Sequence, residues 1–250
     1  MAILSKVPEY FEEKGFHNPV DAFDGPFQYA MGTKLHYFDW LKSQPKYQSA
    51  FNTVMGIQRM NRGDEWFEFY PVEDRLQADS SEPLLVDVGG GLGHDLLGFR
   101  REFPDLPGKL IVQDLPVVID NIKDLPLGIE AMKHDFFNPQ PVKNARAYYL
   151  RTVLHDWPDK QAREILSNIR LAMNKHSILL INENALPEDN VPLYPAELDI
   201  SMMVLFSSLD RTQSQFKELL ESAGFELVQI WTPKVMVPGS GTLFEAVLKQ

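Results

Sequence analysis

The sequence predicts an α/β protein built on a doubly wound, mostly parallel sheet of seven strands, with a helical extension at the N-terminus. Two observations support this prediction. From residue 84 onward, short apolar runs alternate with helical patterns, which is typical of successive β-α-β units. The last two apolar runs flank a segment rich in proline and glycine, MVPGSGT, and such a pair predicts an antiparallel hairpin that closes the sheet.

Residues 1–80 form the predicted helical extension. They are rich in aromatic side chains and carry little strand pattern. In residues 27–41 the apolar side chains fall at roughly helical spacing, a proline then interrupts the pattern, and residues 47–60 predict another helix. A polar stretch at 77–83 separates this region from residues 81–250, which we expect to fold as one α/β domain.

The second region carries the strand and helix signals in order. Asp159 and Arg163 are an i,i+4 pair at the start of one predicted helix. Thr212 and Gln215 form a capping box that opens another helix, and Gly224 ends it. The predicted strands are residues 84–88, 110–113, 129–133, 147–150, 178–181, 225–232 and 243–248.

Composition excludes several classes of function. The 250-residue chain has a formal net charge of −11 and no cluster of lysine and arginine, which disfavours binding to nucleic acid through a basic face. It contains no cysteine, so disulfides, thiolate metal sites and cysteine nucleophiles are excluded. The N-terminus lacks the apolar stretch of a signal peptide, and no apolar run approaches membrane-spanning length. We therefore expect a cytoplasmic protein with no membrane partner.

The stretch from 84 to 114 is the strongest functional signal. Gly89 and Gly91 belong to a glycine turn after the first strand, and Asp114 ends the second strand; glycines let a ligand approach the backbone, and such an acid accepts hydrogen bonds from ribose. GGGLG lacks the final glycine of the dinucleotide fingerprint, and Asp87 would repel phosphate but attract a cation. The pattern favours S-adenosyl-L-methionine. The alternative is an ordinary tight strand-helix turn.

Further polar residues follow the later strands. His155 comes after the fourth strand, Glu183 after the fifth, and Asp210 lies where it could reach the same edge of the sheet. Carboxylates near an imidazole fix its tautomer and raise its basicity, as a general base requires. Asp135 and Phe136 follow the third strand and suit an adenine, one by hydrogen bonding and the other by stacking. The alternatives are a surface His-Asp pair and simple core packing of the aromatic residues.

Six segments together resemble a known family. VDVGGGLG, QDLP, HDFF, RTVLHDW, NENALP and DRTQSQF are similar to segments of the small-molecule O-methyltransferases related to plant caffeic acid O-methyltransferase, in their fungal secondary-metabolite branch. The resemblance runs from about Val7 to the end of the chain. It implies a Rossmann-like methyltransferase fold, with residues 81–250 as the S-adenosylmethionine-binding catalytic domain.

The resemblance also implies residue roles. His155 corresponds to the base that deprotonates the acceptor hydroxyl, and Glu183 and Asp210 correspond to its flanking acids, although the family more often has glutamate at the second of these positions. Arg151 stands where the plant enzymes have a lysine near the cofactor. The implied cofactor-binding residues are Asp87, Gly89, Gly91, Asp114, Leu115, Asp135, Phe136 and Arg151. No metal is required, and no metal-ligand spacing is seen.

An aromatic acceptor is the expected small-molecule partner. By resemblance, residues 1–80 contribute to its pocket, and the aromatic and methionine side chains suggest a flat, apolar phenol such as an aromatic polyketide or a phenylpropanoid. The alternative is that these side chains belong to the ordinary core. The implied substrate-binding residues are Phe51, Met55, Trp157, Met202, Met203 and Phe206.

One departure from the family pattern concerns the N-terminus. The family usually begins with a winged-helix-like domain that builds an intertwined dimer, and this sequence starts after that domain. Without that domain, the usual basis for dimerisation and for closure over the acceptor is missing, and a homodimer and an association with a full-length homologue are the two open possibilities. Two alternative functions stay open: a pericyclase or cyclase that binds S-adenosylmethionine on the same fold, and a short non-catalytic paralogue that partners a full-length homologue. The identity of the acceptor and its site of methylation do not follow from the sequence.

Overall fold

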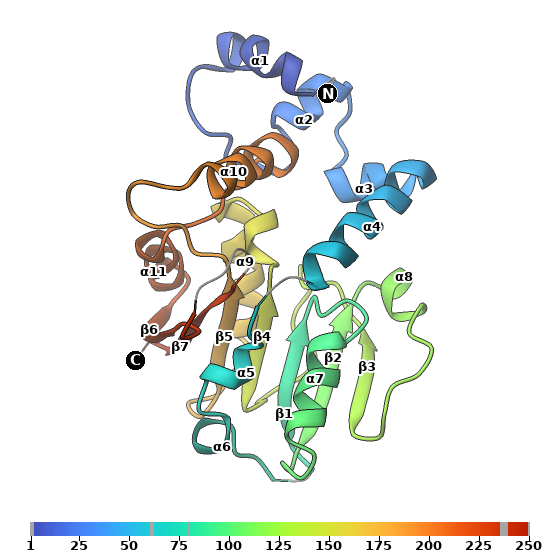
Figure 1. Cartoon of the computed structure of the whole chain (residues 1–250), viewed down its shortest axis with the longest axis vertical. Helices are drawn as coiled ribbons and strands as arrows, with labels where there is room; N and C mark the ends of the chain where they lie inside the picture. The colour runs from blue at the N-terminus through green and yellow to red at the C-terminus, as the bar shows by residue number, and fades with distance from the viewer. Residues whose placement is uncertain (1–2, 61–62, 80, 236–239, 250) are drawn as a thin grey trace.

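A seven-stranded sheet forms the centre of the molecule (Figure 1). The structure, a computed structural model, describes residues 3–60, 63–79, 81–235 and 240–249, without the side chains of 52 and 55–60. The strand order is β3-β2-β1-β4-β5-β7-β6. The strands are β1 (Pro83–Val88), β2 (Lys109–Asp114), β3 (Ile129–Lys133), β4 (Ala147–Arg151), β5 (Ile178–Glu183), β6 (Phe225–Trp231) and β7 (Thr242–Leu248).

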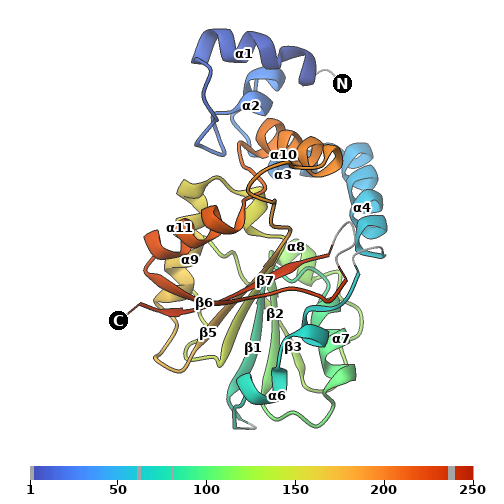
Figure 2. The ribbon, with the colours of Figure 1, turned by 60° about the vertical axis from the view of Figure 1, so that its left-hand side comes forward.

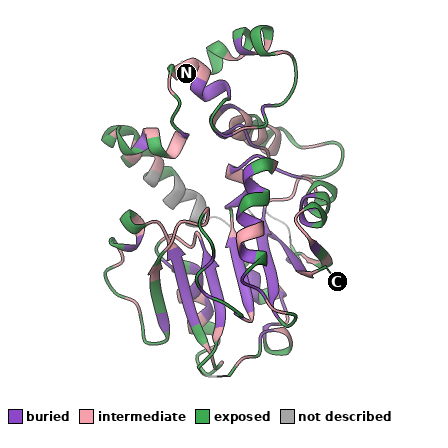
Figure 3. Cartoon of the chain, turned by 180° about the vertical axis from the view of Figure 1, so that it is seen from behind, coloured by how far each residue is buried: buried purple, intermediate pink, exposed green. Residues whose placement is uncertain are grey.

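The pairing confirms the predicted fold class. Strands β1 to β5 pair in parallel, and β7 lies antiparallel between β5 and β6 as one arm of the closing hairpin. Every residue of β5 is buried, because helices cover both faces of the sheet and leave no polar face on a central strand (Figure 3). The edge strands β3 and β6 are only partly buried, and their sequences are correspondingly more polar.

Helices on both faces produce two cores. One face packs against α9 (Asp159–Arg170) and α11 (Gln213–Ser222), and the other packs against α5 (Trp66–Phe69), α6 (Val72–Arg75) and α7 (His94–Glu102). A short helix, α8 (Pro116–Ile119), follows β2. The predicted helix signals are confirmed: Thr212 and Gln215 form the capping box of α11, and Arg163 pairs with Asp159 at 3.1 Å.

Trp66 fixes the second core. Its side chain is fully buried, stacks on Phe99 of α7 with ring centroids 5.5 Å apart, and stacks on Tyr149 of β4 at 5.0 Å. Aromatic side chains dominate core energetics through their large buried area. The segment just before β1 is therefore anchored to the sheet. The proposed division of the chain near residue 80 stays a prediction.

The N-terminal region is helical, as predicted, and its helices within residues 4–60 lie with α10 (Leu193–Phe206) beyond the carboxyl ends of the strands (Figure 2). The expected helix at 27–41 is split in two, because Gly32 adopts a left-handed conformation with φ 60° that ends α2. The elements are η1 (Leu4–Lys6), α1 (Val7–Lys14), α2 (Pro26–Met31), α3 (Tyr37–Lys42) and α4 (Pro45–Met60). Within the described ranges, no helix has the length and apolar character needed to cross a membrane.

Candidate functional site

The glycine turn after β1 leaves its backbone open. Gly89 and Gly91 have φ values of 75° and 60°, which side chains rarely allow. A Cβ atom at Gly89 would lie 2.9 Å from Cγ2 of Val153, so this position also has no room for a side chain. Apart from its two chain neighbours, no heavy atom of the described residues lies within 4 Å of the corresponding position at Gly91. A ligand can therefore reach the backbone at Gly91.

Asp87 lies beneath this turn. Its side chain is 1% exposed, and a Cβ atom added at Gly90 would lie 2.4 Å from its carboxyl group. The φ angle of Gly90 is outside the left-handed region, so the space taken by Asp87, and not backbone strain, requires glycine there. The buried acid thus restricts position 90 to glycine.

Asp114 joins the ends of β1 and β2. Its Oδ2 accepts a hydrogen bond from the Gly91 amide at 2.8 Å, and its Oδ1 accepts one from the Leu115 amide at 2.7 Å. Burial raises the pKa of Asp114, while the two amides act in the opposite direction. Each carboxylate oxygen has a second lone pair, so Asp114 can still accept hydrogen bonds from a ligand hydroxyl.

The predicted adenine residues lie near the same turn. The position of a Cβ atom at Gly89 is 3.6 Å from the ring of Phe136. Oδ1 of Asp135 accepts a hydrogen bond from the Phe137 amide at 3.0 Å. The rings of Phe136 and Phe137 both meet Trp157 edge to face, and both pack against the core of the α9 face. The structure therefore brings Phe136 to the glycine turn and also supports a packing role for both rings.

Arg151 lies in a chain of polar contacts that the sequence did not indicate. Its Nη1 lies 3.3 Å from Asp95 Oδ2 in the first turn of α7 and 3.5 Å from Glu65 Oε2, just before α5. The Tyr149 hydroxyl donates to Asp95 at 2.9 Å and accepts from Asn182 Nδ2 at 3.1 Å. These contacts tie the helix after the glycine turn to the ends of β4 and β5.

His155 lies in a short 3-10 turn, η2 (Leu154–Asp156), just after β4. Its Nδ1 is 3.3 Å from Oδ1 of Asp210, which is 5% exposed, and its Nε2 is 3.6 Å from Oδ1 of Asp156. The predicted contact between His155 and Asp210 is thus present in the geometry. Asp156 is an additional acid beside the ring, on the side of Nε2.

Glu183 reaches the same turn through the backbone. Its Oε1 accepts hydrogen bonds from the Val153 amide at 2.9 Å and the Leu154 amide at 2.8 Å. The side chain is 1% exposed, and its Oε2 has no hydrogen-bond partner among the described residues. Glu183 therefore fixes the turn that carries His155 and acts on the ring through its charge.

The acids change the protonation of the ring. Burial acts to lower the pKa of His155, but the charge of Asp156, the hydrogen bond to Asp210 and the charge of Glu183 raise it to about 10. Burial raises the pKa of Asp156 to about 6, with a further upward effect from Glu183 and Asp210. Burial also raises the pKa of Glu183. The acids around the ring therefore favour the protonated form of His155.

Part of the predicted acceptor pocket forms an aromatic cluster. Trp157 is 7% exposed and stacks on His36, with ring centroids 4.4 Å apart, and Phe206 at the end of α10 lies 5.1 Å from Phe38. The ring centroid of Phe51 in α4 lies 5.8 Å from that of Phe38. The cluster joins the helical extension to the turn of His155.

Three other pocket predictions are less complete. Met202 and Met203 lie half-buried on α10, where their carbonyls accept hydrogen bonds from the residues that end the helix. The side chain of Met55 lies outside the described residues. The sequence did not identify His36, whose pKa burial lowers to about 4; only its position among aromatic residues could have indicated it.

Gly90→Ala should destabilise the fold by about 1–3 kcal/mol, because the added methyl group overlaps a carboxylate that is too buried to move aside. Urea denaturation of Gly90→Ala, Asp87→Ala and the double variant measures this. The double variant should lose less free energy of unfolding than the sum of the two single variants. Simple additivity would mean that Gly90 is not constrained by Asp87.

Comparisons with known proteins identify the family of the chain. Residues 16–226 match the family model of the O-methyltransferase domain. The O-methyltransferase mfmE of Annulohypoxylon moriforme is 40% identical over 247 residues, which cover 98% of this chain and 60% of that protein. The chain spans about 60% of the length of the curated relatives it matches.

Solved structures share the fold. LepI in complex with SAM has a TM-score of 0.90 and 35% identity, with 99% of this chain and 64% of that chain covered. A structure described as a pericyclic reaction enzyme gives the same values. On the extent of the sequence match and the agreement of the fold, the chain belongs to the O-methyltransferase domain family.

Proposed function

We propose that this protein transfers a methyl group from S-adenosylmethionine to a hydroxyl of an aromatic small molecule, with His155 as general base. The observation that carries the proposal is the position of His155. Its ring is held by Asp210 at the carboxyl edge of the parallel sheet, the same edge that carries the open glycine turn and Asp114. Ligands of doubly wound sheets bind at this edge.

The residues at the turn suit S-adenosylmethionine. The open backbone at Gly91 and the free lone pairs of Asp114 provide a polar site for an adenosine, and Phe136 offers an aromatic face beside it. Asp87 adds negative charge beneath the turn, which favours a cationic ligand over a phosphate. The structure described as LepI in complex with SAM has the same fold, which supports this choice. When bound, S-adenosylmethionine supplies the electrophilic methyl group.

His155 and its acids provide the acid-base chemistry. Because Nδ1 faces Asp210 at hydrogen-bond distance, Nε2, which lies 3.6 Å from Asp156, is the nitrogen that would take the proton of an acceptor hydroxyl. Asp210 stabilises the imidazolium that results and fixes the tautomer before the transfer. Glu183 holds the turn through the Val153 and Leu154 amides and so keeps the imidazole in place.

The aromatic cluster would bind the acceptor. Trp157, Phe206 and Phe51 come from three separate segments. Trp157 and Phe206 both lie beside His36, and Phe206 and Phe51 both lie beside Phe38. Flat apolar walls with few polar groups suit an aromatic ring and exclude water from the reaction. We retain a flat phenol as the acceptor class, with Met55, Met202 and Met203 as further candidates for its pocket.

A pericyclase or cyclase on the same fold is the second candidate. The structure described as a pericyclic reaction enzyme, which matches this chain with a TM-score of 0.90, favours it. The intact pair of His155 and Asp210 favours methyl transfer, because a rearrangement needs no base at that position. Release of S-adenosylhomocysteine with phenolic acceptors separates the two functions: a changed product without that release would indicate the rearrangement.

Partners form a separate part of the proposal. The helical extension exposes large apolar side chains, among them Phe16 and Val20, which a second copy or a full-length homologue could cover. Light scattering after size exclusion distinguishes a homodimer from a monomer. Stable association with a homologue in the absence of turnover would favour the non-catalytic alternative.

His155→Ala should lower the rate of methyl transfer roughly 10²–10⁴-fold, because the acceptor then loses its general base. The assay measures S-adenosylhomocysteine released in the presence of phenolic acceptors. His176→Ala changes an exposed histidine and serves as the matched control, with a rate close to that of the parent protein. A His155→Ala protein that methylates at the parental rate would rule out the proposed mechanism.

Asp114→Ala should weaken S-adenosylmethionine binding by about tenfold to several hundredfold, since hydrogen bonds to a charged group contribute about 1.5–3 kcal/mol each. Asp114→Asn keeps one acceptor oxygen and should lose less affinity for S-adenosylmethionine than Asp114→Ala. Asp105→Ala, at an exposed carboxylate, is the control. Calorimetry measures the affinities without requiring turnover, and equal affinity in Asp114→Ala and the parent protein would show that the ligand site has been misplaced.

Cofactor binding should release a proton from His155. The imidazolium is the stable form below a pKa of about 10, and a ligand cation nearby lowers that pKa, so the proton leaves when the lowered value falls toward the pH of the solution. Calorimetry at neutral pH in two buffers of different ionisation enthalpy counts the protons released. S-adenosylhomocysteine lacks the positive sulfur and should release fewer. Equal counts for the two ligands, or a difference that survives in His155→Gln, would contradict this prediction.

A further inference from the structure

The side chain of Arg211 lies directly behind the turn that carries His155. It is 1% exposed, although arginine is rarely buried to this extent without partners. Nη1 donates to the Leu154 carbonyl at 2.8 Å, and Nη2 donates to the Trp157 carbonyl at 2.9 Å. These two carbonyls lie on either side of His155 in the sequence. One planar guanidinium therefore holds the backbone before and after that residue.

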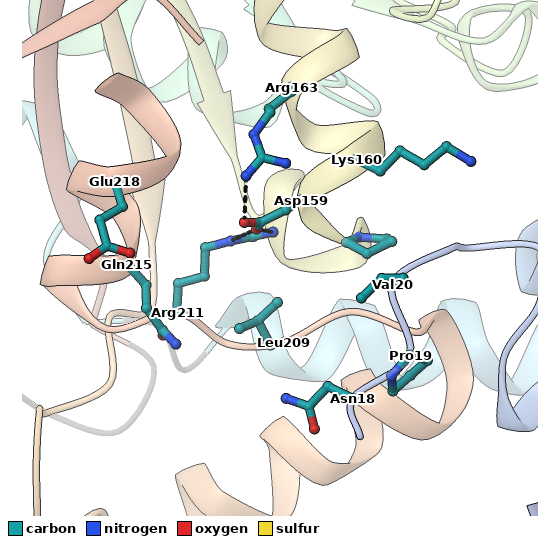
Figure 4. A pocket seen from close by; sticks show the side chains of 11 residues that line it. Asn18, Pro19, Val20, Asp159, Lys160, Arg163, Leu209, Arg211, Gln215 and Glu218 are labelled. Atoms are coloured by element: carbon teal, nitrogen blue, oxygen red, sulfur yellow. Dashed lines mark hydrogen bonds and ion pairs between the residues drawn. The ribbon is translucent and has the colours of Figure 1, made fainter. Parts of the chain in front are cut away.

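Asp159 also binds the guanidinium (Figure 4). Its Oδ1 accepts from Arg211 Nη2 at 2.8 Å and from Nε at 3.1 Å, while its Oδ2 accepts from Arg163 at 3.1 Å. The carboxylate compensates the charge of the buried arginine, which would otherwise be costly to bury. This ion pair borders a cavity of about 520 Å³ between the loop at 18–20, α9 and α11, away from the glycine turn.

Asp210 and Arg211 act on His155 from consecutive positions. Asp210 contacts the ring at Nδ1, and Arg211 holds the backbone on both sides of the ring. Their own backbone is fixed as well: the Asp210 amide donates to Asp199 Oδ1 at 2.9 Å, and the Arg211 carbonyl accepts from the Leu186 amide at 3.0 Å. The backbone at Asp210 and Arg211 therefore links the acid to the turn that carries the imidazole and sets the distance between them.

We propose that Arg211 is a positioning residue for His155: its guanidinium clamps the Leu154 and Trp157 carbonyls and thereby holds the imidazole against Asp210. Lysine cannot replace it, because an ammonium group has no planar fork that reaches two carbonyls and a carboxylate together. The clamp also holds the backbone of Trp157, in the aromatic cluster. The inference rests on the proposed function for its catalytic meaning, whereas the clamp itself concerns only contacts within this chain.

The titration of the His155 imidazole, followed by NMR on this chain, tests the clamp. Arg211→Lys keeps the positive charge but loses the fork, so the contact with Asp210 loosens and the pKa of His155 should fall by about one unit, a tenfold change in its protonation constant. Arg163→Met is the matched control: Arg163 also pairs with Asp159 but contacts neither carbonyl, and its loss should leave the titration unchanged. If Arg211 had only a structural role, Arg211→Lys would lower the melting temperature and leave the titration of His155 in the folded protein unchanged.

A second variant keeps the test decisive if Arg211→Lys does not fold. Asp159→Asn leaves Arg211 in place and weakens its anchor, and the pKa of His155 should shift in the same direction by a smaller amount. An unchanged His155 titration in a folded Arg211→Lys or, failing that, in Asp159→Asn overturns the proposal. Methyl transfer is measured separately. If the parent protein transfers no methyl group, the proposed function is refuted but the clamp is not, because only the titration of His155 tests the clamp.

Discussion

Two buried carboxylates, Glu183 and Asp210, and the partly exposed Asp156 act on the imidazole of His155, and most of the functional end of the molecule is arranged around them. A buried carboxylate is costly unless hydrogen bonds and opposite charge compensate it. Glu183 accepts hydrogen bonds from two backbone amides in the turn after β4, and Asp210 contacts Nδ1 of the ring. These contacts bring the end of β5, the turn after β4 and the loop before α11 to one place. The parallel sheet makes this possible because all its carboxyl ends meet at one edge.

Much of the fold could be predicted from apolar runs. The structure differs from the prediction at the end of β5, where polar residues are buried. The pattern placed the end of β5 at residue 181, but Asn182 and Glu183 continue the strand, fully buried and paired with β7. A polar residue at a strand end usually marks solvent, so local pattern does not reveal one that is buried for use at a site. The helical spacing over 27–41 was similarly correct in type, but it did not account for the left-handed Gly32 that divides it.

The candidate site was predictable where the strand-end pattern or the family resemblance indicated a residue, and less so for contacts that neither indicates. Asp114 and Gly91, 23 residues apart, and His155 and Asp210, 55 residues apart, lie together as predicted. The contact of Arg151 with Asp95 spans 56 residues, and that of Arg211 with the Leu154 carbonyl spans 57. The periodicity of apolar residues in the sequence does not indicate such long-range pairs. Glu183 illustrates the same limit, since its position was predicted and its hydrogen bonds to the backbone were not.

The acid cluster and the proposed chemistry place opposite demands on His155. A general base must be neutral before it accepts a proton, whereas Asp156, Asp210 and Glu183 favour the imidazolium and raise its pKa to about 10. In the proposed function, a sulfonium donor would resolve this conflict, because it would bring a positive charge to the same edge of the sheet and disfavour a second one on the ring. The acids would then compensate the charge of the ring once it has taken the acceptor's proton. An arrangement that stabilises the imidazolium is therefore compatible with a base that works only while the cationic donor is bound.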